Sequence, residues 1–162
     1  MKRLNTALLG FATMLGLAGC ASTPSTQTPN IASTGLLICA QNELCPAIKV
    51  TWNEQERSNL KITAYLPSAK EDYDIQQFVF LIDQKPYSYT PTAATTHEYI
   101  NRMVPHRSSN YIVVPSSFLS TFKNAKNIEL KLVTDKGNIT RAVYRNGQES
   151  SAYRAFINLY QP

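Results

Sequence analysis

The feature that most constrains the fold is the alternation of apolar and polar side chains in short segments joined by short connections. Residues 47–53 (AIKVTWN) place apolar side chains at every second position: Ile48, Val50 and Trp52. Residues 60–66 (LKITAYL) repeat this pattern, and the connection EQERS between the two segments is polar throughout. A period of two is typical of a β-strand with one buried face, so the pair is predicted to form a hairpin.

Further segments of the same kind follow along the chain. Predicted strands cover residues 75–83, 86–90, 98–104, 110–115, 127–134 and 139–145. The last two flank a turn at residues 135–138, in which Gly137 is expected to adopt a positive φ. The connections are too short for parallel crossovers, so the strands are predicted to be antiparallel.

Two segments show the apolar spacing that is typical of helices. Residues 115–126 begin with a proline and offer Ser116 or Ser117 as an N-cap, and their apolar side chains fall on one face. Residues 148–160 are predicted to form a terminal helix on the same grounds. The expected fold class is therefore α+β: mainly antiparallel β, a sandwich-like sheet, with two short helices.

The amino-terminal segment has the form of a secretory signal. Lys2 and Arg3 precede an apolar stretch from Ala7 to Ala18. A transmembrane helix needs about 20 apolar residues, so this stretch is too short to be one. It ends at a cysteine, after which the chain becomes a string of Ser, Thr, Pro and Gln.

The sequence Leu17-Ala18-Gly19-Cys20 resembles the lipobox of bacterial lipoproteins. The resemblance covers the signal only. It implies that residues 1–19 are removed, that the Cys20 thiol receives a diacylglycerol, and that the new amino terminus usually receives a fatty acyl chain such as palmitate. Two or three acyl chains anchor a soluble domain firmly, whereas one chain anchors it only marginally. By the family's sorting rule, Ala21 in place of an aspartate implies the outer membrane, with the domain facing the periplasm.

The rest of the chain divides into two parts. Residues 20–35 carry the lipidated cysteine and are short, polar and interrupted by prolines, which predicts a flexible tether. Residues 36–162 have the length of one compact unit and are predicted to form a single globular β-rich domain.

Two cysteines remain once Cys20 is lipidated. Cys39 and Cys45 are separated by five residues, and in an oxidising compartment this spacing predicts a small disulfide loop. Free thiols and a redox pair are the alternatives, although the spacing is not Cys-x-x-Cys.

Charge is distributed unevenly along the predicted domain. Residues 36–100 hold five basic and eight acidic side chains, a net charge of −3, whereas residues 101–162 hold nine and three, a net charge of +6. The basic half suggests an anionic partner, and neutral substitutions that test this would be made at its arginines: Arg102, Arg107, Arg141 and Arg145. The alternative is that these charges are solvated or complement the acidic half. Nucleic acid is not an expected partner of an exported, lipid-anchored domain.

Candidate catalytic and metal-binding residues are few. The chain has two histidines, His97 and His106, and no Gly-x-Ser-x-Gly segment that would mark a hydrolase serine. His97-Glu98 begins like the zinc motif His-Glu-x-x-His, but Asn101 stands where the second histidine is required. The acidic residues at 71, 72 and 74 lack the ligand spacing of a calcium loop. No catalytic residue is assigned, and no metal or cofactor is expected.

Tyrosines offer a second candidate for binding. Tyr87, Tyr89, Tyr99 and Tyr111 lie on predicted strands and suit an interface, or else they cover the sheet and complete the core. The sequence therefore predicts a membrane-anchored envelope lipoprotein whose domain is a non-enzymatic binding or assembly module for a protein or envelope component. An envelope enzyme or enzyme inhibitor and a small-ligand carrier are the alternatives.

Overall fold

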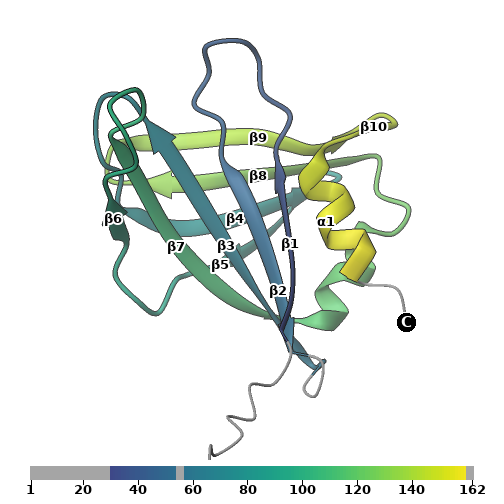
Figure 1. The fold of residues 1–162 in the computed structure, drawn as a ribbon. Helices are drawn as coiled ribbons and strands as arrows, with labels where there is room; N and C mark the ends of the chain where they lie inside the picture. Colours follow the sequence, from purple (N-terminus) through teal and green to yellow (C-terminus); the bar gives the residue numbers. More distant parts are fainter. Residues whose placement is uncertain (1–29, 54–56, 160–162) are drawn as a thin grey trace, which may run out of the picture.

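The computed structural model describes residues 30–53 and 57–159. The predicted signal, Cys20 with its predicted lipid, and most of the predicted tether lie outside these residues. The predicted fold class is confirmed in its main lines, because the described residues form two antiparallel sheets and two short helices (Figure 1).

Within the described residues, each sheet has five strands. The first has the order β1-β2-β3-β7-β6, with strands at Asn30–Leu36, Ala47–Asn53, Asn59–Ser68, His106–Pro115 and Thr96–Glu98. The second has the order β10-β9-β8-β4-β5, with strands at Gln148–Glu149, Gly137–Arg145, Asn127–Thr134, Ile75–Ile82 and Lys85–Tyr89. The helices are a 3-10 helix, η1, at Ser116–Phe122 and an α-helix, α1, at Ser151–Leu159.

The two hairpins with the clearest sequence patterns form as predicted. β2 pairs with β3 in the register that sets Val50 opposite Ile62, so the apolar side chains of both strands lie on one face. β8 pairs with β9, and Gly137 in their turn has a φ of 113°. The alternation of apolar residues is a local property, and it specifies the strand and its buried face together.

The buried faces of both sheets contribute to a single hydrophobic core cluster. Phe80 of β4 is fully buried and contacts three aromatic rings of the helices, with centroid distances of 5.1 Å to Phe118, 6.1 Å to Phe122 and 6.2 Å to Phe156. The contacts with Phe118 and Phe156 are edge-to-face, and such contacts stabilise the fold beyond the burial of the rings. The two helices therefore complete a core that the sheets begin.

The position of α1 is set at its first turn. The Ser150 hydroxyl accepts a hydrogen bond from the Tyr153 N–H at 2.9 Å, which is the role of an N-cap. The Ser151 hydroxyl accepts a hydrogen bond from the Leu36 N–H at 2.8 Å, so the end of β1 is tied to the start of α1. The helix lies beside β1 and β10 in Figure 1.

The boundary of the predicted tether is corrected by β1. Residues 30–35 were expected to belong to a flexible segment, but Asn30–Leu36 pairs with β2 along its whole length. The reason is that backbone hydrogen bonds to β2 and the contact with α1 hold a segment that lacks the apolar alternation of the other strands.

The predicted helix at 115–126 is shorter and differently capped. It is a 3-10 helix at Ser116–Phe122, and its N-cap is Pro115, without a side-chain cap hydrogen bond. The Ser116 N–H instead donates to the Ser58 carbonyl at 2.8 Å, so the start of the helix is held by the β2–β3 connection. Asn124, with a φ of 68°, directs the chain away from a helical path.

The predicted strand at 98–104 is wrong beyond its first residue. β6 ends at Glu98, and the segment that follows, residues 99–105, forms the connection to β7. The Asn101 side chain accepts hydrogen bonds from the N–H groups of Met103 and Val104, both at 2.9 Å. A side chain that satisfies local backbone donors replaces a sheet ladder with a turn.

The predicted disulfide is present: Cys39 and Cys45 are bonded to each other. Their short loop connects β1 to β2 and lies near β9, where the Ile38 N–H donates to the Ala142 carbonyl at 2.8 Å. The loop therefore links the first sheet to the second.

Candidate binding surface

The four tyrosines expected to form a contact patch are divided among different surfaces. Tyr87 and Tyr89 of β5 pack on Phe118, with ring centroids 5.8 Å and 5.4 Å away. Burial raises the pKa of the Tyr89 phenol, and the neighbouring Tyr87 adds to the effect. These two rings belong to the margin of the core. Tyr99 is 69% exposed on the β6–β7 connection, and Tyr111 lies on β7 of the other sheet.

Three of the four candidate arginines form ion pairs within the chain. Arg107 pairs with Glu98 across β7 and β6, and the Arg145 Nη2 lies 3.0 Å from the Glu129 Oε1. The Arg141 Nε lies 3.2 Å from the Glu43 Oε2, with its side chain only 18% exposed. Arg102 is exposed on the β6–β7 connection. Two of these pairs join the basic half to the acidic half, so the uneven charge is partly neutralised inside the fold.

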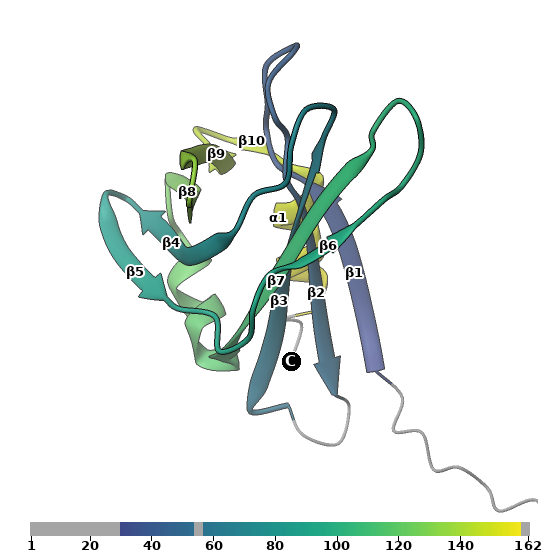
Figure 2. The ribbon, with the colours of Figure 1, turned by 90° about the vertical axis from the view of Figure 1, so that its left-hand side faces the viewer.

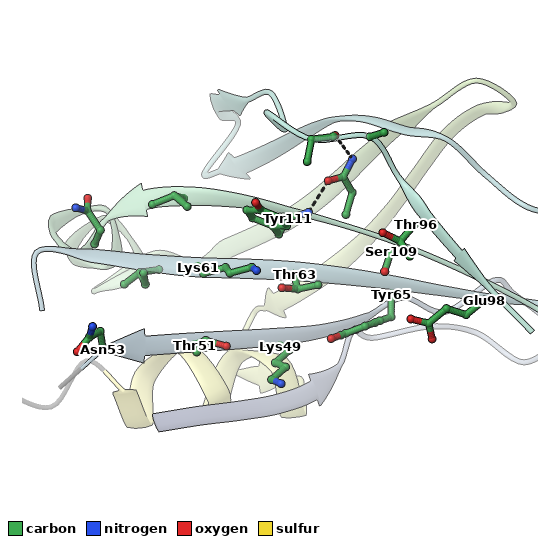
Figure 3. Close-up of a pocket in the computed structure, with 16 residues that line it drawn as sticks. Lys49, Thr51, Asn53, Lys61, Thr63, Tyr65, Thr96, Glu98, Ser109 and Tyr111 are labelled. Atoms are coloured by element: carbon green, nitrogen blue, oxygen red, sulfur yellow. Dashed lines mark hydrogen bonds between the residues drawn. The ribbon is translucent and has the colours of Figure 1, made fainter. Parts of the chain in front are cut away.

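The alternate side chains of the first sheet that point away from the core form a polar face, which we call the outer face (Figure 3). An open hollow of about 790 Å³ lies on it. Its lining comes mainly from β2, β3 and β7, and includes Lys49, Thr51, Lys61, Thr63, Tyr65, Ser109 and Tyr111. Thr96 and Glu98 of β6 complete one side. Hydroxyl groups, tyrosine rings and lysines thus converge on one hollow.

The two lysines of the outer face are its main charges. The Lys61 Nζ lies 3.7 Å from the centroid of the Tyr111 ring, a cation–π distance. Lys49 sits opposite Thr63 on the neighbouring strand. Among the described residues, neither lysine forms an ion pair with a carboxylate. The only carboxylate that lines the described part of the hollow, that of Glu98, is paired with Arg107.

A second hollow of about 470 Å³ adjoins the first, because Lys49 and Tyr65 line both. The β6–β7 connection, residues 99–105, contributes Ile100 and Val104 to its lining. The same connection carries the exposed side chains of Tyr99 and Met103, the latter 85% exposed. An ordered loop with exposed apolar side chains is typical of a contact surface.

The two histidines of the chain meet at one acidic segment on the inner side of this region. The His97 Nε2 lies 3.1 Å from the Asp74 Oδ1, and the His106 Nδ1 lies 3.2 Å from the Asp72 Oδ2. These contacts hold the β3–β4 connection against β6 and β7. The predicted solvated acidic turn is therefore anchored on one side.

Ser108 completes a line of serine, histidine and aspartate with His97 and Asp74. The Ser108 Oγ lies 3.2 Å from the His97 Nδ1, but it is fully buried and accepts a hydrogen bond from the Tyr73 N–H at 2.8 Å. A nucleophile must reach its substrate, so a serine with this burial is suited to holding the β3–β4 connection. This geometry favours a structural role for Ser108.

A further charged contact of the β3–β4 connection also holds it against a neighbouring element. Lys136 lies 3.2 Å from Glu71, and its hydrogen bond with this carboxylate raises the pKa of the Lys136 ammonium. Burial raises the pKa of the Tyr73 phenol, and the charge of Glu71 adds to the effect.

Within the described ranges, no three histidine, cysteine or acidic side chains are grouped in a way that could hold a metal ion. No helix in the described part of the chain is long and apolar enough to cross a membrane.

Sequence reasoning did not assign Lys49, Lys61, Thr63 and Tyr65 to a site. The signal was present, because these residues occupy the polar positions of the two alternating segments 47–53 and 60–66. What the sequence lacked was the neighbour β7, which brings Tyr111 to the same face.

Comparisons of this chain with protein-family models, with curated proteins and with solved structures find no match.

Proposed function

We propose that this chain is an envelope lipoprotein, anchored to the outer membrane through Cys20, whose sandwich-like periplasmic domain is a non-enzymatic binding module. Its contact surface is the outer face together with the β6–β7 connection beside it. The observation that carries the proposal is the open hollow of about 790 Å³ with two lysines that no carboxylate of the described chain neutralises.

The placement of the surface supports this proposal. β1 begins at Asn30, at the end of the molecule where the predicted tether would join it. The β6–β7 connection lies at the opposite end in both Figure 1 and Figure 2. A domain attached at the β1 end presents Tyr99 and Met103 away from its attachment, where they are accessible to a partner.

The energetics of the surface support binding as well. When a partner removes exposed aromatic and methionine side chains from water, the free energy of the complex falls. The polar hollow beside them supplies orientation through hydroxyl groups and charge. The apolar β6–β7 connection and the polar hollow together offer a partner both hydrophobic contacts and oriented polar contacts.

The test is capture from native membranes by crosslinking and pull-down with the full, tagged chain. Thr63→Glu places a carboxylate in the centre of the hollow, and Met103→Ser removes the most exposed apolar side chain of the connection. Thr140→Glu is the matched control, because Thr140 is exposed on β9 of the other sheet. Loss of the captured partner in Thr63→Glu and Met103→Ser, with retention in Thr140→Glu, is the expected result. Equal capture by all three variants and the native chain contradicts this surface.

A further inference from the structure

We propose that the hollow of the outer face binds an acidic glycan, a sugar chain that carries carboxylate groups. This inference rests on the proposed function and names the class of its ligand. Four properties of the hollow carry it: its unneutralised charge, the spacing of its lysines, its hydroxyl groups and its tyrosine rings.

The charge of the hollow favours an anionic ligand. Lys49 and Lys61 form no ion pair among the described residues, whereas Glu98 is neutralised by Arg107. The described lining of the hollow therefore carries an excess of positive charge. Lys49 is half-buried, so water screens its charge less than it would screen that of a fully exposed lysine. An anionic ligand would meet two cations and no free carboxylate among the described lining residues.

The register of the sheet fixes how these cations are arranged. Lys49 lies opposite Thr63, and Lys61 lies opposite Thr51, so the two lysines are diagonal neighbours across β2 and β3. The Cα atoms of diagonal neighbours on a sheet are about 7–8 Å apart. Each lysine thus has a threonine directly opposite it on the neighbouring strand. A ligand that alternates charged and hydroxyl groups matches this arrangement.

The tyrosines extend the same surface. Thr63 lies opposite Tyr111 on β7, and Tyr65 lies opposite Ser109, so the two rings are also diagonal neighbours. A tyrosine ring offers an apolar face to the C–H groups of a sugar and a hydroxyl to its polar groups. The Lys61 Nζ lies over one face of the Tyr111 ring, so this ring offers a sugar its hydroxyl group and its uncovered parts beside a positive charge.

An acidic peptide is the competing class of ligand. Peptides commonly add to a sheet at its edge through backbone hydrogen bonds, and they anchor through apolar side chains in pockets. The hollow lies over the strands β2, β3 and β7, and most of its described lining residues carry hydroxyl, amide or amino groups, with Val113 as an exposed apolar exception. These groups favour a hydroxyl-rich chain over a peptide.

The first experiment measures binding of polygalacturonate to the full chain purified in detergent. Dextran is the neutral glycan, and poly-L-glutamate is the acidic peptide. Saturable binding of polygalacturonate is expected, with no binding of dextran. The Lys49→Gln/Lys61→Gln variant is expected to weaken binding by about tenfold or more, because each lost ammonium group removes a charge-assisted contact.

Two further variants distinguish specific binding of an acidic glycan from nonspecific binding of any polyanion. Lys123→Gln/Lys126→Gln removes the same charge from exposed positions at η1 and before β8, and it is expected to leave binding unchanged. Thr63→Val keeps the shape and the charge of the hollow but removes a hydroxyl, and it is expected to weaken polygalacturonate binding selectively. Circular dichroism melting curves verify that each variant is folded.

Several outcomes overturn the inference. No binding of polygalacturonate at low salt overturns it, as does equal weakening by the two lysine pairs. Poly-L-glutamate that binds as tightly, with the same loss in Lys49→Gln/Lys61→Gln, assigns the hollow to an acidic peptide instead. If polygalacturonate fails while Thr63→Glu still abolishes capture from membranes, the ligand class is wrong and the binding module stands.

Discussion

Gly35 of β1 lies so close to Ala152 of α1 that a Cβ atom at residue 35 would come within 2.2 Å of the Ala152 backbone nitrogen. The obstacle is backbone, which cannot rotate away as the end of a side chain can. A residue without a side chain is therefore required where the first strand and the last helix meet. This contact closes the domain between segments that are far apart in the sequence.

Gly35→Ala is expected to destabilise the domain by about 1–3 kcal/mol, because α1 must shift or the strand must bend to admit the methyl group. Thermal melting followed by circular dichroism measures the effect. Thr34→Ala, at the exposed neighbouring position, is the control and is expected to change stability little. An unchanged melting temperature in Gly35→Ala contradicts the close contact.

Reduction of the Cys39–Cys45 bond is expected to lower stability at the low end of about 2–4 kcal/mol, because the closed loop is short and constrains little of the unfolded chain. Mass spectrometry of the non-reduced protein after alkylation checks the bond itself. Two alkylated thiols at these positions in the non-reduced protein show that the pair is not formed. The double variant Cys39→Ser/Cys45→Ser then gives its contribution to the melting temperature.

Ser108→Ala is expected to cost about 1–3 kcal/mol, because the N–H of the half-buried Tyr73 loses its acceptor. Ser109→Ala, one residue further on the outward-facing side of β7, is the matched control. If Ser108 were instead a catalytic nucleophile, its replacement would abolish hydrolysis of a model ester without a loss of stability. Measurement of both quantities on one variant separates the two roles.

Stability is expected to fall as the pH rises above about 10. Burial raises the pKa of the phenols of Tyr73, Tyr89 and Tyr153, so the folded chain holds these protons more tightly than the unfolded chain does. Their contribution is therefore complete below the unfolded pKa and is lost as the pH rises through the folded pKa. Lys136, whose pKa is raised by its hydrogen bond with Glu71, acts in the same direction.

Tyr89→Phe tests this dependence at one position, because it keeps the ring against Phe118 and removes the ionisable group. The melting temperature of the variant is expected to fall less steeply than that of the native chain between about pH 9 and about pH 11. At neutral pH the two proteins are expected to melt within a few degrees of each other. A fall of identical slope in both shows that Tyr89 does not contribute.

Cys20→Ala is expected to leave an unlipidated precursor that remains uncut or washes out of detergent-free membranes. The physical reason is that the domain then lacks the acyl chains that we propose as its anchor in the bilayer. Membrane fractionation and gel migration measure the change. A variant that fractionates and migrates like the native chain contradicts the lipoprotein assignment.

Local patterns predicted the secondary structure well where one face of a strand is apolar. The segments at 47–53, 60–66 and 127–134 form strands at those positions, apart from the extension of the second to Ser68. The pattern failed at 98–104, where the Asn101 side chain captures backbone donors and ends the strand early. A hydrogen bond formed by one side chain within a turn leaves no trace in the periodicity of its neighbours.

The sequence alone predicted most of the strand positions and the disulfide pair, because each depends on residues that are near one another in the chain, and the lipobox stays a prediction. The tertiary structure alone decided β1, whose pairing uses backbone groups and whose cover, α1, comes 115 residues later at the Leu36–Ser151 contact. It also separated Tyr87 and Tyr89, which lie at the core margin, from Tyr111, which lies on the outer face. The outer face itself exists only because β2, β3 and β7 are neighbours in the sheet. A strand's own residues specify which of its sides is buried, whereas the order of strands depends on the free energy of packing the whole chain.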